Sequence, residues 1–407
     1  MARQAPCSAR YVAKEEDGMV EKGQRMEFDI DSLRATSPNL WVFFDECTRD
    51  FAEDECNDLM QSFEPSVEFP LPYMIYIVLV LLLQFRHKGR EEKIAWTICF
   101  QFKSQHFAIS YRKFGLRFFC SPEADEYVKK EIVVRLRKAT EIADKIIEPI
   151  VKDRLNSGFF AIQNRSTLLF EKYTFFRGKT KEAFESEPPG PVTVKSGPGI
   201  LVRSLDPFQP KREGFYYTQA MLDAFFSYLE HIMVLLLAFQ GFDLNRDDIV
   251  SFMSDDWTKK YNRLFDPQKD SNFMRHYRKL EEVKERWRNT LAHGGFEKKG
   301  SSLYVAFPDC EYIPVTLSRY KHSVHFSMFP VEEKDYKWMC NVLDSFLGDL
   351  HSGTWKRKMD FIESGLDVFF NAEMIGAYKH ALNSDEDMVS FIRAESEMWE
   401  RNANMDW

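Results

Sequence analysis

Residues 288–295 read RNTLAHGG and place a guanidinium, an amide and an imidazole at the end of a predicted helix. Asn289 and His293 are four residues apart, so they share one helix face, whereas Arg288 projects from the adjoining face. Because Gly294 allows the helix to end directly after His293, the imidazole lies in the last turn, where unpaired carbonyl groups favour its protonated form. This set suits phosphodiester chemistry without a metal, since His can move a proton and Arg can hold a phosphate as charge builds on it.

The same pattern also has a structural interpretation. A His that precedes Gly at a helix end is commonly a cap that complements the helix dipole. Arg and His with four to six residues between them form a weak pattern, and Arg319 and His325 are a second such pair in a stretch of predicted strand and loop. Spacing alone leaves both interpretations open.

Several helices must position these residues. Apolar residues repeat at helical spacing over 215–239, 247–264, 272–292 and 331–350, and two short strands are predicted at 303–307 and 312–317. Residues 288–295 therefore end the third helix of a bundle, before a short hairpin and a closing helix. The apolar faces of 215–239 and 331–350 exceed what one small bundle needs to bury, which favours a dimer.

The first part of the chain has a different pattern. The apolar run 73–85 is too short to span a membrane and predicts a buried helix. Short segments at 94–102, 107–112 and 116–120 predict an antiparallel meander. A long helix follows from Ser121 and Pro122 to about residue 150, and 159–176 is expected to return to strand.

We therefore expect an α+β chain that is mostly helical. Residues 1–25 form a flexible N-terminus without a signal peptide, and 26–184 form an α+β domain with a small antiparallel sheet plus helices. The Pro- and Gly-rich segment 185–211 is a linker. A helical domain follows at 212–352, and 353–407 form an acidic helical extension with eleven Asp/Glu against six Lys/Arg.

Composition narrows the function further. The 407 residues suffice for two or three domains, and the net charge of −8 argues against a protein that coats nucleic acid or anionic membranes non-specifically. The seven Cys include no C-x-x-C pair, which favours free thiols in a reducing cytoplasm over a disulfide scaffold or a structural zinc site. We expect no metal or cofactor, since P-loop, G-x-G-x-x-G, H-E-x-x-H and G-x-S-x-G motifs do not occur.

The pattern Arg-Asn-x-x-Ala-His-Gly at a helix end, in this order of helices, closely resembles the HEPN superfamily over about residues 212–352. Its members are helical bundles that usually dimerise, and many are metal-independent endoribonucleases found as toxins or abortive-infection effectors. The resemblance implies Arg288, Asn289 and His293 as catalytic residues. It also implies an acidic or polar residue on the earlier helix, for which Glu230 is the first candidate and Asp223 the second, although Glu230 can equally be a plain surface residue.

By the resemblance, two copies of the 212–352 domain place two motifs in one cleft, and the 2′-hydroxyl of RNA attacks its own phosphate. Local charge fits this partner, because residues 272–300 carry eight Lys/Arg against four Asp/Glu. Ordinary i,i+4 ion pairs are the alternative role for these side chains. The candidate RNA-binding residues are Arg275, Arg278, Lys279, Lys284 and Arg286.

Two further alternatives stay open. The chain can be a catalytically silent HEPN-type sensor or scaffold that binds a protein or nucleic acid, with residues 26–184 as the recognising part. It can also be a regulator whose acidic tail occupies the basic cleft. If the chain is a ribonuclease, we expect an inhibitory or activating protein partner or an inactive resting state.

Overall fold

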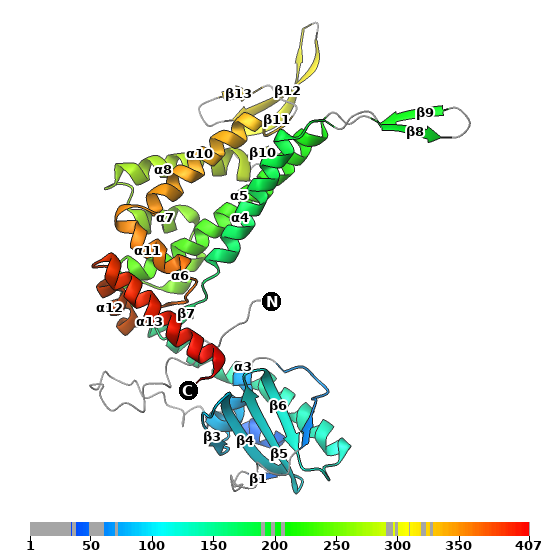
Figure 1. Ribbon diagram of the computed structural model, residues 1–407, viewed down its shortest axis with the longest axis vertical. Coiled ribbons are helices and arrows are strands. Elements are labelled where there is room, and N and C mark those ends of the chain that lie inside the picture. The colour runs from blue at the N-terminus through cyan, green and yellow to red at the C-terminus, as the bar shows by residue number, and fades with distance from the viewer. Residues whose placement is uncertain are drawn as a thin grey trace. The chain divides into compact units, whose positions relative to one another are not determined.

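The structure is a computed structural model, and it forms two compact units, each with its own hydrophobic core (Figure 1). The first unit comprises Met1–Ser157 and Arg393–Trp407, and the second comprises Gly158–Ile392. The mostly helical α+β class expected from the sequence is confirmed. The residues described are 34, 38–48, 61–69, 72–188, 192–196, 200–204, 208–289, 296–297, 300–308, 310–318, 323–325 and 329–406.

The first unit contains a six-stranded antiparallel sheet with the order β1-β4-β5-β6-β2, in which β3 also pairs with β4. Along β4 the side chains of Trp96, Ile98, Phe100 and Phe102 are buried and alternate with less buried neighbours, as expected for one covered face. The predicted meander is confirmed. The strands are β1 (Cys47–Thr48), β2 (Gln61–Phe63), β3 (His87–Lys88), β4 (Ile94–Phe102), β5 (Gln105–Arg112) and β6 (Gly115–Cys120).

Helical segments in the described part of this unit include the two that were expected, and both are confirmed. The apolar run forms α2 (Pro72–Tyr76) and a π-helix, η4 (Ile77–Leu82), whose buried side chains join the core under the sheet. The long helix is α3 (Glu126–Asn156), and a 3₁₀ helix, η2 (Pro38–Phe43), lies against it.

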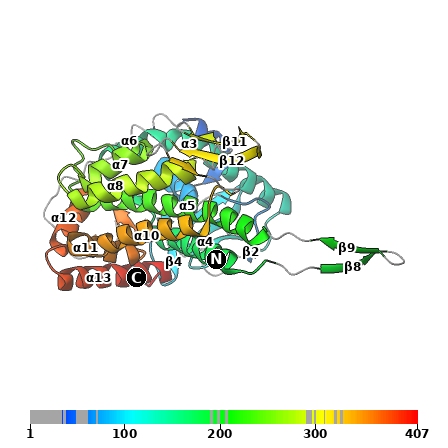
Figure 2. The same cartoon turned by 90° about the horizontal axis from the view of Figure 1, so that it is seen from above.

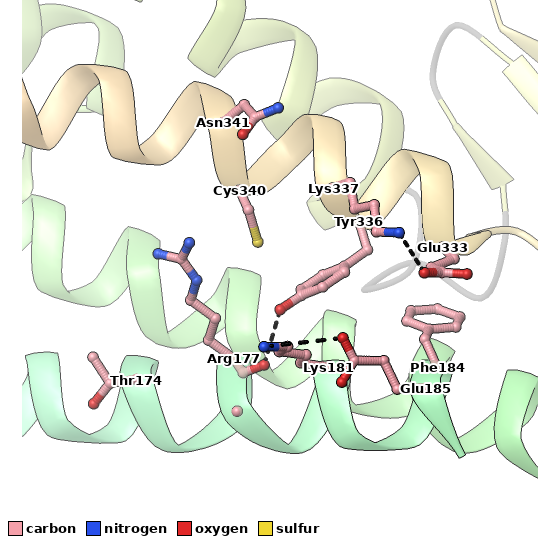
Figure 3. Close-up of a pocket in the computed structure, with 11 residues that line it drawn as sticks. Thr174, Arg177, Lys181, Phe184, Glu185, Glu333, Tyr336, Lys337, Cys340 and Asn341 are labelled. Atoms are coloured by element: carbon pink, nitrogen blue, oxygen red, sulfur yellow. Dashed lines mark hydrogen bonds and ion pairs between the residues drawn. The ribbon is translucent and has the colours of Figure 1, made fainter. Parts of the chain in front are cut away.

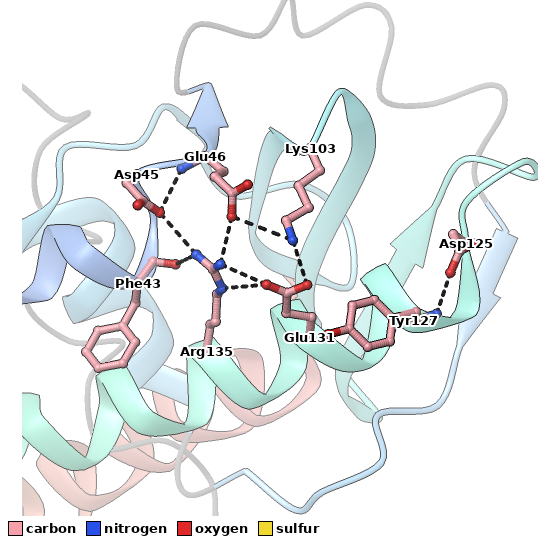
Figure 4. A network of polar contacts seen from close by, with 8 residues as sticks. All are labelled: Phe43, Asp45, Glu46, Lys103, Asp125, Tyr127, Glu131 and Arg135. Atoms are coloured by element: carbon pink, nitrogen blue, oxygen red, sulfur yellow. Dashed lines mark hydrogen bonds and ion pairs between the residues drawn. The ribbon is translucent and has the colours of Figure 1, made fainter.

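Arg135 of α3 is the centre of a polar network in this unit (Figure 4). Its guanidinium donates to the Phe43 carbonyl at 3.2 Å and to Glu46 at 2.7 Å. It also bonds Asp45 at 3.1 Å and Glu131 at 2.8 Å. This network fixes residues 43–46 on α3.

The second unit is a bundle around α5 (Gln209–Leu236), which continues as a 3₁₀ turn, η5 (Leu237–Phe239). Figure 2 shows α4 (Ser166–Glu185) beside α5, and rings join them: Phe170 lies 5.1 Å from Tyr228 and Tyr173 lies 5.3 Å from Phe225. The other helices described in this unit are α6 (Ile249–Ser254), α7 (Trp257–Phe265), α8 (Ser271–Val283) with the π-helix η6 (Lys284–Arg288), α10 (Glu333–Leu350), α11 (Gly353–Glu363), α12 (Ala372–Ala381) and the first part of α13 (Asp385–Asn404).

Two local expectations were wrong. Residues 159–176 were expected to form strand, but β7 spans only Ala161–Ile162, and α4 begins at Ser166. The buried Ser166, Tyr173 and Thr180 are seven residues apart along α4, which places them on one face of the helix. One helix was expected over 247–264, but the chain forms α6 and α7. Asp256 separates them, since its side chain accepts the backbone N–H of Lys259 and caps α7.

The chain divides differently from the expected boundaries of 184 and 352. Residues 158–184 belong to the second unit because α4 packs on α5. Much of the expected extension 353–407 also completes this core: Phe239 of η5 lies 5.3 Å from Phe361 and 4.5 Å from Tyr378. From Arg393 on, the chain belongs to the first unit.

These contacts remove one argument for a dimer, because the apolar faces of α5 and α10 are buried within the unit itself. The segment Gln209–Phe239 is long and apolar enough to cross a membrane, but 78% of its most apolar window is buried. Burial in the core of the second unit explains why this segment is so apolar.

Smaller strand elements complete the second unit. The predicted linker 185–211 contains a hairpin of β8 (Val192–Ser196) and β9 (Ile200–Ser204) between α4 and α5. The predicted strands at 303–307 and 312–317 are confirmed as β11 and β12. They lie in a sheet of β10 (Phe296–Glu297), β11 (Gly300–Phe307), β12 (Cys310–Ser318) and β13 (Ser323–His325), while β14 (Val368–Phe369) pairs with β7.

The cysteines differ in whether they form a disulfide. Cys47, Cys120 and Cys340 are free thiols. Cys99 of β4 is disulfide-bonded, so the expectation that the cysteines are all free thiols was wrong.

Candidate active site

Helix α5 carries both acidic candidates. Asp223 and Glu230 are seven residues apart, two turns along the same helix face. Both side chains are partly exposed, whereas Leu222 and Leu229 beside them are fully buried. The core therefore fixes the helix and leaves the two carboxylates at its surface.

The Arg288 motif begins in a π-helical turn. Helix α8 changes into η6 at Lys284, and Asn289 follows with helical backbone angles. Trp287 anchors this turn, since its indole is only 4% exposed and lies 5.6 Å from the ring of Trp338 in α10. Wide turns of this kind inside α-helices often occur at functional sites, because they turn the next side chains to a new direction.

Arg288 is directed at α5. Its Nε donates to Oδ1 of Asp223 at 3.3 Å, and its Nη1 lies 3.4 Å from Oδ1 of Asn289. The two partners of the ion pair are 34% and 48% exposed, so solvent reaches both. The structure thus brings together Arg288, Asn289 and Asp223, the second of the two acidic residues considered from the sequence.

Glu230 has a different environment. One of its carboxylate oxygens lies 3.7 Å from Nζ of Lys260, a side chain that is 5% exposed. Lys284 is also nearby: burial lowers the pKa of its ammonium, the Glu230 carboxylate opposes that shift, and the charge of Arg288 adds to it. Glu230 therefore balances buried cations.

The five candidate RNA-binding residues fall into two groups. Arg275, Arg278 and Lys279 are exposed on α8, where they can meet a polyanion. Arg286 forms an i,i+4 pair with Glu282 at 3.0 Å and lies over the Trp287 ring, and Lys284 lies over the Trp257 ring at 5.1 Å. The pair of Arg286 matches the alternative role in an i,i+4 ion pair, whereas Lys284 is held by a ring contact.

His293 lies outside the described residues, as do Gly294 and Gly295. The described part of the site therefore consists of a guanidinium held by a carboxylate and an adjacent amide. An Arg held in this way keeps free N–H groups that can donate to two oxygens of a phosphate. Arg319 of the second Arg-His pair also lies outside the described part of the chain.

Sequence reasoning missed a buried histidine in the helix that carries the motif. His276 is 1% exposed, and its Nε2 lies 2.5 Å from Oδ2 of Asp349 at the end of α10. This bond holds the pKa of Asp349 below its usual range and fixes α8 against α10. The signal was the position of His276 between Phe273 and Leu280 on the buried face, where a polar group needs a partner.

Within the described ranges, no group of three or more His, Cys, Asp or Glu side chains could hold a metal ion. Comparison of the chain with known proteins finds no relative. No family model matches the chain, and no curated protein or solved structure is significantly similar to it.

Proposed function

We propose that the chain is a metal-independent endoribonuclease of HEPN type. The observation that supports this most directly is the ion pair between Arg288 and Asp223, at 3.3 Å. It directs the guanidinium of the motif away from the buried side of the π-helical turn, next to the amide of Asn289. A cation that was only a surface charge near a helix end would need no partner on another helix.

In this proposal the residues have distinct roles. His293 takes the proton from the 2′-hydroxyl of RNA or gives one to the leaving oxygen, and Arg288 stabilises the charge that builds on the phosphate. Asn289 donates a further hydrogen bond, and Asp223 orients Arg288. The 2′-oxygen forms the new bond to phosphorus and the 5′-oxygen leaves, which yields a 2′,3′-cyclic phosphate and a 5′-hydroxyl.

We further propose that two copies pair through residues 212–352, so that two motifs share one cleft. The exposed cations of α8 would bind the RNA backbone. As a toxin or abortive-infection effector in the cytoplasm, the enzyme would need a partner or a resting state that restrains it. The first unit would supply recognition of the RNA or the trigger.

The experiment is incubation of the purified full-length protein with a mixture of tRNA and mRNA in EDTA. Cleavage with cyclic phosphate ends, and no cleavage of an RNA with a 2′-deoxy sugar at the cut position, is the expected result. RNA binding without cleavage would contradict the enzyme and favour the silent sensor or scaffold.

A further inference from the structure

The second unit contains a cavity of about 650 Å³ between α4 and α10 (Figure 3). This volume lies in the range of small-molecule sites. Its lining residues include Gly178, Tyr336 and Cys340, together with charged side chains of both helices. None of these residues belongs to the motif around Arg288.

Gly178 is the feature that packing does not explain. It lies inside α4, where glycine is among the least favourable residues, and its φ is not positive. A Cβ built at this position meets no atom within 4 Å. Any larger residue would therefore project into open space at the cavity wall, so glycine keeps the helix backbone accessible there.

An aromatic wall stands at one end of the cavity. Phe184 packs on Tyr336 with ring centroids 5.8 Å apart. Its position is fixed from behind by Gly214 of α5, where a Cβ would come within 2.6 Å of Phe184 Cε1. The carboxylates of Glu185 and Glu333 line the same end. This end offers a flat surface and two acceptors to a ring that carries N–H donors.

Two lysines line the cavity next to these carboxylates. Lys181 projects from α4 and Lys337 from α10, and both side chains are 66% exposed. The Nζ of Lys181 lies 3.9 Å from Glu185, and the Nζ of Lys337 is paired with Glu333 at 2.6 Å, so a bound anion would compete with these carboxylates. The Arg177 guanidinium is held by Asp344 at 2.5 and 2.6 Å. An anionic group between the two helices would meet an ammonium from each wall.

We propose that this cavity binds a small organic phosphate with a flat ring that donates hydrogen bonds, which is the chemistry of a nucleoside monophosphate. The phosphate would lie between Lys181 and Lys337, and the ring would lie on Phe184 with its amino group toward the carboxylates. The site is independent of the RNA-cleavage proposal, and each can fail without the other.

The test is binding of AMP, GMP and CMP to the full-length protein, measured by calorimetry and by the rise in melting temperature at millimolar ligand. Adenosine and inorganic phosphate are the comparison ligands. We expect at least one nucleotide to bind, and to bind about tenfold or more tightly than either of its parts.

Gly178→Leu fills the cavity and should abolish this binding. Gly348→Leu is the matched control, because Gly348 also lies inside a helix, α10, with open space around its Cβ but outside the cavity. It should bind as the wild type does. Lys181→Met combined with Lys337→Met should reduce nucleotide affinity to that of the nucleoside. No binding of any of the three nucleotides, or unchanged binding to Gly178→Leu, would overturn the proposal.

Discussion

Replacement of Asp223 by Asn removes the charge that faces Arg288 and keeps the size of the side chain. The pair is 3.3 Å long, but its partners are 34% and 48% exposed, so water and salt screen the attraction. Exposed pairs of this kind contribute about 0.2–1 kcal/mol to the free energy of unfolding. If Asp223 orients Arg288 for catalysis, a misplaced guanidinium should slow cleavage by about 10².

The assay is single-turnover cleavage of one defined RNA by Asp223→Asn, with RNA binding measured separately at matched salt. Urea unfolding reports stability, and the midpoint should shift by less than the equivalent of about 1 kcal/mol. A fall in rate with nearly unchanged binding would identify Asp223 as a positioning residue. Asp223→Glu retains the charge and should recover part of the rate.

Glu230→Gln is the matched control, because it makes the same change of charge two turns along α5, beside Lys260. It should slow cleavage far less than Asp223→Asn. A wild-type rate for Asp223→Asn, or an equal loss in both variants, would refute the orienting role of Asp223.

Three further results are expected. Arg288→Lys should lose cleavage by about 10² or more while it retains RNA binding, because an ammonium lacks the planar fork that grips two oxygens; a wild-type rate would return Arg288 to the role of a surface charge. Burial lowers the pKa of Lys358 from 10.5 to about 8, so between these pH values the unfolded state binds more protons than the folded state. The free energy of unfolding should therefore rise with pH across that window, by up to about 3 kcal/mol. At neutral pH, Lys358→Met should unfold at a higher urea concentration than the wild type, and its stability should not rise with pH in this window. A destabilised variant would show that the contact of Lys358 with the Trp355 ring contributes more than the burial of its charge costs. Light scattering of the full chain should give twice its mass of 48.0 kDa, and a strict monomer at micromolar concentration would count against a shared cleft.

The local pattern of apolar and polar residues was sufficient to predict much of the fold. The alternation in residues 94–102 and the helical stripe in α3 each specify one buried face, so these elements could be located from the sequence. The same reasoning failed at 159–176, where aromatic residues suit a strand and a helix equally well. Only the contacts of Phe170 and Tyr173 with α5 select the helix.

The partners in the site could be predicted only in part. Asp223 and Glu230 lie on one face of α5, so the sequence identifies both and cannot say which turn meets Arg288. That choice depends on where α8 crosses α5 and on the π-helical turn at Lys284–Arg288, which rotates the residues after it. Neither feature has a local signature.

The central claim is tested most directly by comparison of the wild type with His293→Ala on one RNA in EDTA. If His293 only complements the helix dipole, as its sequence position also allows, it contributes typically about 0.3–1 kcal/mol, whereas loss of an acid-base group costs about 10²–10⁴ in rate. We predict that the wild type produces 2′,3′-cyclic phosphate ends and that His293→Ala produces none, with the circular dichroism and melting of both nearly unchanged. A His293→Ala protein that cleaves RNA at the wild-type rate would contradict the account.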